Sequence, residues 1–177
     1  MKLQELLQKI KDELKLRNYS PRTIESYLGC LADYFKYIKV IKKEPEINFI
    51  KRYLLEKRTR QQSPQTINLY LRAIKYFYRE ITKSKTIIDI KFAKTTSKLP
   101  VVLSRNEIEK IINSIENKKH KLLIALSYSS GLRVSEVVNL KAKDINMEEL
   151  TIYIKNAKGK KDRITVFPER FKDDLKK

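Results

Sequence analysis

The residues best suited to phosphate chemistry lie in the run Gly131-Leu132-Arg133-Val134-Ser135-Glu136. The glycine ends one predicted helix, and Arg133 stands at the start of the next, beside the positive end of the helix dipole. An arginine is tolerated there more readily when an anion binds beside it, and a phosphate is the obvious candidate. Glu136 lies three residues further on, within reach of the Arg133 guanidinium. The alternative interpretation is a local ion pair on a surface helix.

A second group of cations lies at the tip of a predicted β-hairpin. Residues 151–154 and 163–166 alternate with period two, and the residues between them include Lys158, Lys160 and Lys161. A hairpin with lysines at its tip, beside a turn that carries an arginine, is suited to gripping a phosphodiester. The alternative is a charged hairpin that protects its own edge from pairing with another strand.

The charge of the whole chain favours a polyanionic partner. Its 177 residues contain 40 Lys+Arg and 21 Asp+Glu, a formal net charge of +19 that is spread over both halves. A lysine-rich solvated surface and a basic protein of the membrane surface are the alternatives. The single cysteine, Cys30, excludes an internal disulfide, and the single histidine, His120, excludes a multi-histidine metal site. With no membrane-length apolar run and no signal-peptide segment, we expect a cytoplasmic protein.

The elements that must position these residues begin with a helical first half. Apolar spacing predicts helices over residues 3–16, 21–38, 47–56 and 64–81. Ser20-Pro21 and Ser63-Pro64 are matching start signals, and the second and fourth helices repeat at an offset of 43 residues. The pattern indicates two helix–turn–helix units packed as one bundle.

Polar faces of these helices could contact DNA. Arg72, Lys75 and Arg79 share one face of the fourth helix, with Tyr76 beside it, and long side chains on such a face reach phosphates. Gln65 and Asn68, near the start of that helix, are placed to reach base edges. The alternative for the basic face is plain solvation. The complete set expected to contact DNA is Arg22, Thr23, Gln65, Asn68, Arg72, Lys75, Tyr76, Arg79, Lys160, Lys161 and Arg163.

The second half begins after a segment that loses helical periodicity, residues 83–100. We expect a DNA-binding helical domain at residues 1–92, a linker at 93–100 and a second domain at 101–177. Ser104 and Glu107 form a predicted capping box at the start of a helix, and a further helix runs from about residue 119 to 130.

Taken together, these features resemble the tyrosine site-specific recombinases of the Xer or phage-integrase type. The family's first catalytic arginine sits in a G-L-R-x-S-E-L box, which residues 131–137 match with Val137 for the last leucine. Its hairpin turn, G-K-G-x-K-x-R, is similar to residues 157–163, with Ala157 in place of the first glycine. The first half is similar to the family's helical core-binding domain, and the whole chain follows the family's order.

The resemblance implies a mainly α fold with a small β-hairpin or sheet: a SAM-like core-binding bundle and an incomplete α+β catalytic domain. It implies that a tyrosine attacks a DNA phosphodiester to form a 3′-phosphotyrosyl link, while arginines and a histidine stabilise the phosphorane. Arg133 and Lys158 are then catalytic, Lys158 as the acid for the leaving 5′-oxygen, and Glu136 supports Arg133. No metal, ATP or other cofactor is expected. The expected partner is double-stranded DNA, with no membrane and no small-molecule substrate, and self-association on DNA stays open.

The sequence departs from the family pattern after the hairpin. The family's H-x-x-R box and nucleophilic tyrosine belong C-terminal to it, whereas His120 precedes the arginine box and the last tyrosine is Tyr153. We therefore expect a C-terminally truncated recombinase that binds DNA without cleaving it. The alternative is a non-catalytic DNA-binding protein, either a regulator or a remnant of integration. RNA binding is disfavoured because the aromatic residues fall on core stripes.

Overall fold

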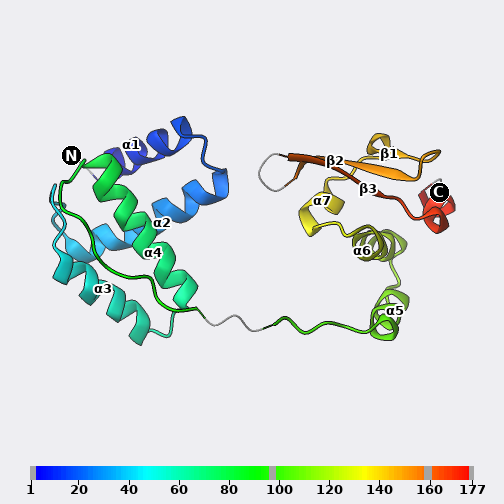
Figure 1. Ribbon diagram of the computed structural model, residues 1–177, viewed down its shortest axis with the longest axis horizontal. Helices are drawn as coiled ribbons and strands as arrows, with labels where there is room; N and C mark the ends of the chain where they lie inside the picture. Colours follow the sequence, from blue (N-terminus) through cyan, green and yellow to red (C-terminus); the bar gives the residue numbers. More distant parts are fainter. Residues whose placement is uncertain (1–2, 96–98, 158–160, 176–177) are drawn as a thin grey trace. The chain divides into compact units, whose positions relative to one another are not determined.

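The chain folds as two units in a computed structural model that describes residues 3–95, 99–157 and 161–175. The units are Met1–Lys98 and Leu99–Lys177. The first is entirely helical apart from its last segment, and the second combines short helices with a small antiparallel sheet (Figure 1). The mainly α fold with a small sheet that the sequence predicts is confirmed.

The helices of the first unit begin where the repeated serine–proline pairs predict. Ser20 and Ser63 each accept a hydrogen bond at 3.2 Å, from the backbone N–H of Thr23 and Thr66 respectively. Each proline occupies the first helical turn, where its missing N–H costs nothing. The four helices are α1 (Leu3–Leu16), α2 (Pro21–Ile38), α3 (Ile47–Thr59) and α4 (Pro64–Tyr76).

The core of the first unit takes apolar side chains from every helix. Leu14, Leu31, Ile50 and Leu71, one from each helix, are almost completely buried. After α4 the backbone widens into a π-helical turn, η1 (Phe77–Ile81), where the sequence predicts continued α-helix. In this wider turn two consecutive aromatic residues, Phe77 and Tyr78, are both buried.

The segment that follows η1, where the sequence predicts a loss of helical periodicity from residue 83, packs onto the first unit. Ile88 is buried in the core of the first unit, and Ile90 packs against it. Asn68 of α4 then holds Ala93 by two hydrogen bonds: its Nδ2 donates to the Ala93 carbonyl at 3.0 Å, and its Oδ1 accepts the Ala93 N–H at 2.7 Å. We call residues 84–95 the strap.

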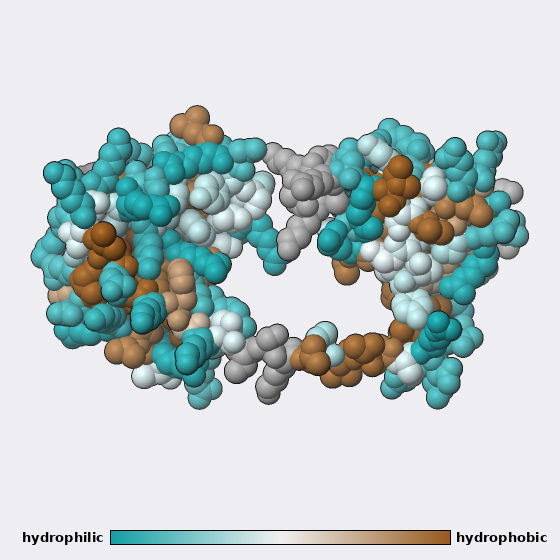
Figure 2. Space-filling view, viewed as in Figure 1, coloured by the Kyte–Doolittle hydropathy of each residue, from teal (hydrophilic) through white to brown (hydrophobic). Residues whose placement is uncertain are grey.

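The second unit begins with an exposed apolar stretch and then forms helices with predicted caps. Leu99, Val101 and Val102 are exposed, and Figure 2 shows hydrophobic side chains gathered on the segment that precedes α5. Ser104 and Glu107 form the predicted capping box at the start of α5. The helices are α5 (Arg105–Asn113), α6 (Lys118–Ser130) and α7 (Val134–Val138), followed later by α8 (Lys172–Leu175).

A three-stranded antiparallel sheet completes the second unit. Its strands are β1 (Ile145–Asn146), β2 (Thr151–Ala157) and β3 (Lys161–Val166), in that order across the sheet. Ile152 faces Thr165 and Ile154 faces Arg163 across the β2–β3 pair. The two isoleucines are buried in the core of this unit, so Arg163 and Thr165 lie on the inner face of the sheet, because directly opposed residues share a face.

Candidate phosphate site and nucleic-acid interface

The candidate phosphate site is built on the turn between α6 and α7, residues 131–136, here called the arginine turn. Gly131 ends α6 in the left-handed conformation, with φ +60°, which glycine adopts without strain. Arg133 is the first residue outside α7 and has an extended backbone. Its backbone N–H donates to Glu136 Oε2 at 2.8 Å, and its guanidinium Nη1 donates to Glu136 Oε1 at 2.6 Å. The local Arg133–Glu136 pair that the sequence predicts is therefore present.

The Glu136 side chain is largely covered by the protein and is ionised. Its side chain is 7% exposed, whereas that of Arg133 is 53% exposed. Burial alone opposes ionisation of the carboxyl, but hydrogen bonds from the Arg133 backbone and from the guanidinium groups of Arg163 and Arg133 outweigh it and lower the pKa of Glu136 to about 2. Glu136 is thus a fixed anion at neutral pH.

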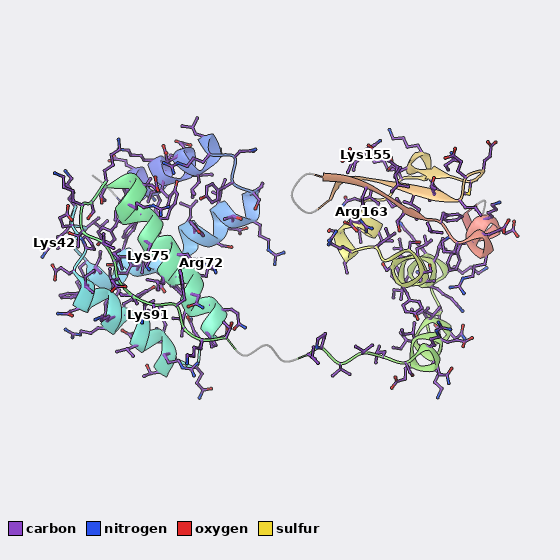
Figure 3. The ribbon with its side chains drawn as sticks, in the orientation of Figure 1. Lys42, Arg72, Lys75, Lys91, Lys155 and Arg163 are labelled. Atoms are coloured by element: carbon purple, nitrogen blue, oxygen red, sulfur yellow. The ribbon has the colours of Figure 1, made fainter. Side chains whose placement is uncertain are left out.

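Arg163 reaches the same carboxylate from the sheet. Its Nη2 donates to Glu136 Oε2 at 2.8 Å and to the Gly131 carbonyl at 3.0 Å. Figure 3 shows Arg163 extending from β3 toward α7. Two residues along the strand, the Thr165 hydroxyl donates to the Ser130 carbonyl at 2.8 Å. The last carbonyls of α6, which have no partner within the helix, thereby gain donors from β3.

The charges at the arginine turn do not cancel. Two guanidinium groups share one carboxylate, so one positive charge is left over on a half-exposed arginine. Such a site can bind an anion and can stabilise negative charge that develops on it. Among the residues that the structure describes, no cluster of three or more His, Cys, Asp or Glu side chains could hold a metal ion.

The predicted lysines of the hairpin tip cannot be added to this geometry. Lys158 and Lys160 lie outside the described residues. Lys161 begins β3 opposite Ala157, and its side chain lies outside the described part of the chain. The convergence of Arg133 and Lys158 on one phosphate therefore stays a prediction.

In the first unit, Arg72 and Lys75 form what we call the α4 basic face; Arg79, which the sequence predicts on the same face, lies in the π-helical turn η1. The Arg72 guanidinium carbon lies 5.4 Å from the centre of the Phe92 ring, and Lys75 Nζ lies 5.1 Å from it. Lys75 also donates to the Ile90 carbonyl at 2.9 Å. The strap thus holds Arg72 and Lys75, both labelled in Figure 3, beside the exposed Phe92.

The other expected DNA contacts of the first unit have mixed surroundings. Arg22 and Gln65 are exposed, while the Thr23 hydroxyl lies 2.8 Å from that of Ser20. Arg79 is exposed, and its Nε donates to Glu80, which also pairs with Arg17.

Two residues expected on the DNA-contacting surface are buried. Asn68 is 7% exposed, and both ends of its amide are taken up by Ala93, so it does not reach outward from the start of α4. Tyr76 is 5% exposed and packs edge-on against the rings of Tyr19 and Tyr27. Both corrections have one cause: other segments of the first unit cover these positions, and helical spacing alone does not reveal such cover.

An ion pair between a buried lysine and a half-exposed aspartate in the first unit is absent from the predicted sites. Lys57 is buried, pairs with Asp33, and lies 5.0 and 5.1 Å from the ring centres of Tyr53 and Tyr70. The Tyr53 hydroxyl donates to the same Asp33 carboxylate at 2.9 Å. A signal was available in the sequence, because Lys57 continues the buried stripe of Ile50 and Tyr53 at helical spacing.

Comparison with protein-family models gives a match for each unit. Residues 101–176 match the phage integrase family, and residues 6–88 match the phage integrase N-terminal SAM-like domain. No helix in the described parts of the chain is both long enough and apolar enough to cross a bilayer.

Curated relatives are recombinases. The chain is 40% identical over 75 residues to tyrosine recombinase XerA of Pyrococcus horikoshii, covering 42% of this chain and 26% of that protein. It is 26% identical over 177 residues to an integrase/recombinase of Escherichia coli, covering 97% of this chain and 52% of the relative. Where the similarity extends over the whole chain, it therefore spans about half the length of the relative.

Solved structures give the same fold. XerH site-specific recombinase, in a pre-cleavage complex with its difH substrate, aligns with a TM-score of 0.63 at 26% identity, covering 97% of this chain and 56% of that one. The Tn1549 transposon integrase in complex with transposon right end DNA aligns with a TM-score of 0.66 at 19% identity, covering 91% and 56% of the two chains.

Proposed function

This chain belongs to the phage integrase family of tyrosine recombinases, and from that premise we propose that its 177 residues bind duplex DNA through its phosphates without cutting it. The observation that carries the proposal is the arginine turn, where Arg133 and Arg163 share the single carboxylate of Glu136. The remaining positive charge is suited to a phosphodiester, and the net charge of +19 supplies the long-range attraction.

The roles at the phosphate follow from the charges. We assign Arg133 to the non-bridging oxygens, where a half-exposed guanidinium can donate two hydrogen bonds. Glu136 holds that guanidinium from the buried side. In the strand breakage and rejoining that the family relationship suggests, Lys158 takes the role of the acid that protonates the leaving 5′-oxygen.

The first unit is proposed to hold the duplex by the α4 basic face and by Arg22 and Gln65. Arg72 is the strongest candidate because it is exposed and stacked on Phe92, which limits the freedom that it loses on binding. Asn68 and Tyr76 are left out of this proposal because they are buried.

Binding is tested with a labelled duplex and fluorescence anisotropy over a range of salt. The affinity should fall steeply with salt, because several phosphates are neutralised. Arg72→Ala should weaken binding roughly fivefold and reduce the salt slope by about one. Arg52→Ala is the matched control, because Arg52 is an exposed arginine on α3 whose guanidinium carbon lies 5.6 Å from the Phe49 ring centre. Equal effects of the two substitutions would refute the role given to α4.

The absence of cleavage is tested separately with supercoiled plasmid. The proposal rests on the order of residues in the sequence: His120 precedes Arg133, and no tyrosine follows Tyr153. Neither nicked plasmid nor a covalent protein–DNA adduct on a denaturing gel is expected. An adduct formed by this chain alone would overturn the non-cutting half of the proposal and leave the binding half standing.

A further inference from the structure

We infer that Arg163 is a positioning residue for Arg133: it fixes both ends of the arginine turn and offsets the charge of Glu136, so that the charge of Arg133 stays available to a DNA phosphate. This inference deepens the proposed function and rests on it for the identity of the anion. It removes Arg163 from the residues expected to contact DNA directly.

The first support is geometric. A single nitrogen, Arg163 Nη2, contacts both the Gly131 carbonyl and Glu136 Oε2, at 3.0 and 2.8 Å. These acceptors stand two residues before and three residues after Arg133 in the chain. Because the same carboxylate also binds the backbone and the guanidinium of Arg133, its orientation fixes that of Arg133. The Arg163 guanidinium, which binds Glu136 from the sheet, therefore limits the orientations that the Arg133 side chain can adopt.

The second support is that β3 turns the face with Arg163, and not the face with Ile164, toward the core of the second unit. Arg163 and Thr165 point inward, while Ile164 and Val166 are each 65% exposed. A one-residue change of register would exchange the two faces, burying the two apolar side chains and exposing the arginine. The same exchange would expose Phe167, which follows β3 and is completely buried in the core of the second unit. The observed register therefore buries Phe167 and at the same time lets Arg163 and Thr165 bind the end of α6.

The third support is electrostatic. With Arg163 at 34% side-chain exposure and Glu136 at 7%, their ion pair is partly withdrawn from water. Without Arg163, Arg133 and Glu136 would form a neutral pair, and a phosphate would compete with a carboxylate for one guanidinium. With Arg163 present, the three groups keep one positive charge, and it lies on the most exposed of the three side chains, that of Arg133.

One experiment needs no DNA. The order of the Arg133 Nε–H group is measured by ¹⁵N relaxation in the 177-residue protein and in the Arg163→Gln variant. We expect Arg133 to become markedly more mobile in the variant, while amide signals of the sheet stay dispersed. Arg105→Gln removes an equal charge from α5 and should leave Arg133 unchanged. Unaltered order of Arg133 in Arg163→Gln would overturn the inference.

The second experiment is a double-mutant cycle on duplex affinity, with Arg163→Gln and Arg133→Ala made singly and together. We expect Arg163→Gln to weaken binding about tenfold alone, equivalent to ~1.4 kcal/mol, and less than about twofold when Arg133 is already alanine. Equal losses in both backgrounds would mean that Arg163 contacts DNA by itself and would overturn the inference.

Arg163→Lys serves where Arg163→Gln fails to fold, and it also separates charge from geometry. Lysine keeps the positive charge but lacks the planar fork of guanidinium donors, so we expect it to restore only part of the Arg133 order and part of the affinity. Complete restoration would mean that charge alone matters and would refute positioning. If the unaltered protein does not bind duplex DNA, the proposed function fails, and the relaxation experiment still decides the role of Arg163.

Discussion

Glu136→Gln is the sharpest test of the arginine turn, because glutamine keeps the size of the side chain and removes its charge. Three hydrogen bonds end on this carboxylate, from the Arg133 backbone, the Arg133 guanidinium and the Arg163 guanidinium. Glutamine offers one neutral acceptor oxygen and turns an amide donor toward a guanidinium. Two of the three bonds end on Oε2, and the amide oxygen can still accept both of them without the charge, whereas the bond from Arg133 Nη1 to Oε1 is lost.

The expected loss of stability follows from the exposure of each partner. The pair with the half-exposed Arg133 guanidinium contributes ~0.5 kcal/mol, and the capping bond to the Arg133 N–H contributes about 1 kcal/mol. The pair with the less exposed Arg163 contributes about 1.5 kcal/mol. Because two of the three bonds are kept in neutral form, the expected loss is about half of the summed ~3 kcal/mol, roughly 1.5 kcal/mol, against the 5–15 kcal/mol typical of a folded domain.

Urea unfolding, monitored by hydrogen exchange with mass spectrometry, measures the loss of stability in each unit separately. With a slope of about 1.5 kcal/mol per molar urea, the urea midpoint of the second unit should fall by about 1 M, while that of the first unit stays constant. Glu149→Gln, at an exposed glutamate of the same unit, should cost less than about 0.5 kcal/mol. A shift of the Glu136→Gln midpoint no larger than that of the control would refute the reasoning.

Three further predictions concern acid, the Asp33–Lys57 ion pair and the strap. Because the pKa of Glu136 is lowered to about 2, the stabilisation that its ionised form provides is complete above pH 4.5, the ordinary pKa of a glutamate, and is lost as the pH falls toward 2. An acid titration should therefore show a loss of second-unit structure between these pH values, and Glu136→Gln should remove this pH dependence. Asp33→Ala leaves the buried Lys57 ammonium without its carboxylate and should lower the stability of the first unit, measured by urea unfolding, by about 3 kcal/mol. Lys57→Met removes the charge itself and should cost less than about 1 kcal/mol. A cost for Lys57→Met greater than that for Asp33→Ala would contradict this prediction. Asn68→Ala removes both hydrogen bonds to Ala93 and should speed amide exchange in residues 88–95 while leaving the exchange of α2 unchanged; unchanged exchange in the strap would show that other contacts hold it.

The features that the sequence predicts best are those whose partners lie within four residues. Ser20 and Ser63 cap α2 and α4 as predicted, and Ser104 with Glu107 forms the predicted capping box. Each needs only a side-chain oxygen and a backbone N–H three residues later. Because both partners of each bond belong to one short stretch of chain, these caps can be predicted from the local sequence.

Side chains that face other segments are predicted less well. Helical spacing assigns Asn68 to a polar face, but its partner is Ala93, 25 residues away. Lys57 shows the converse case, a charged residue on a buried stripe whose position is stable because Asp33 and two tyrosine rings surround it. In both cases the deciding contact comes from an element whose approach the residue's own helix does not specify.

The arginine turn contains one ion pair that the sequence predicts, between Arg133 and Glu136, and one that it does not, between Arg163 of β3 and Glu136. Arg133 and Glu136 are three residues apart on one helix start, so their pairing follows from local geometry. The third member, Arg163, is 27 residues from Glu136, and its contribution depends on which face of β3 is turned inward. Period-two alternation fixes that Arg163 and Thr165 share a face but does not say which face is buried, because apolar side chains follow both alternations: Ile164 and Val166 on one, and Phe167 on the other. The structure buries Phe167 completely and leaves Ile164 and Val166 exposed. Arg163 and Thr165 lie on the inner face of β3 with this register, and Arg163 therefore reaches Glu136. The third member of the arginine turn thus depends on which apolar side chains the second unit buries, and the local sequence does not specify that choice.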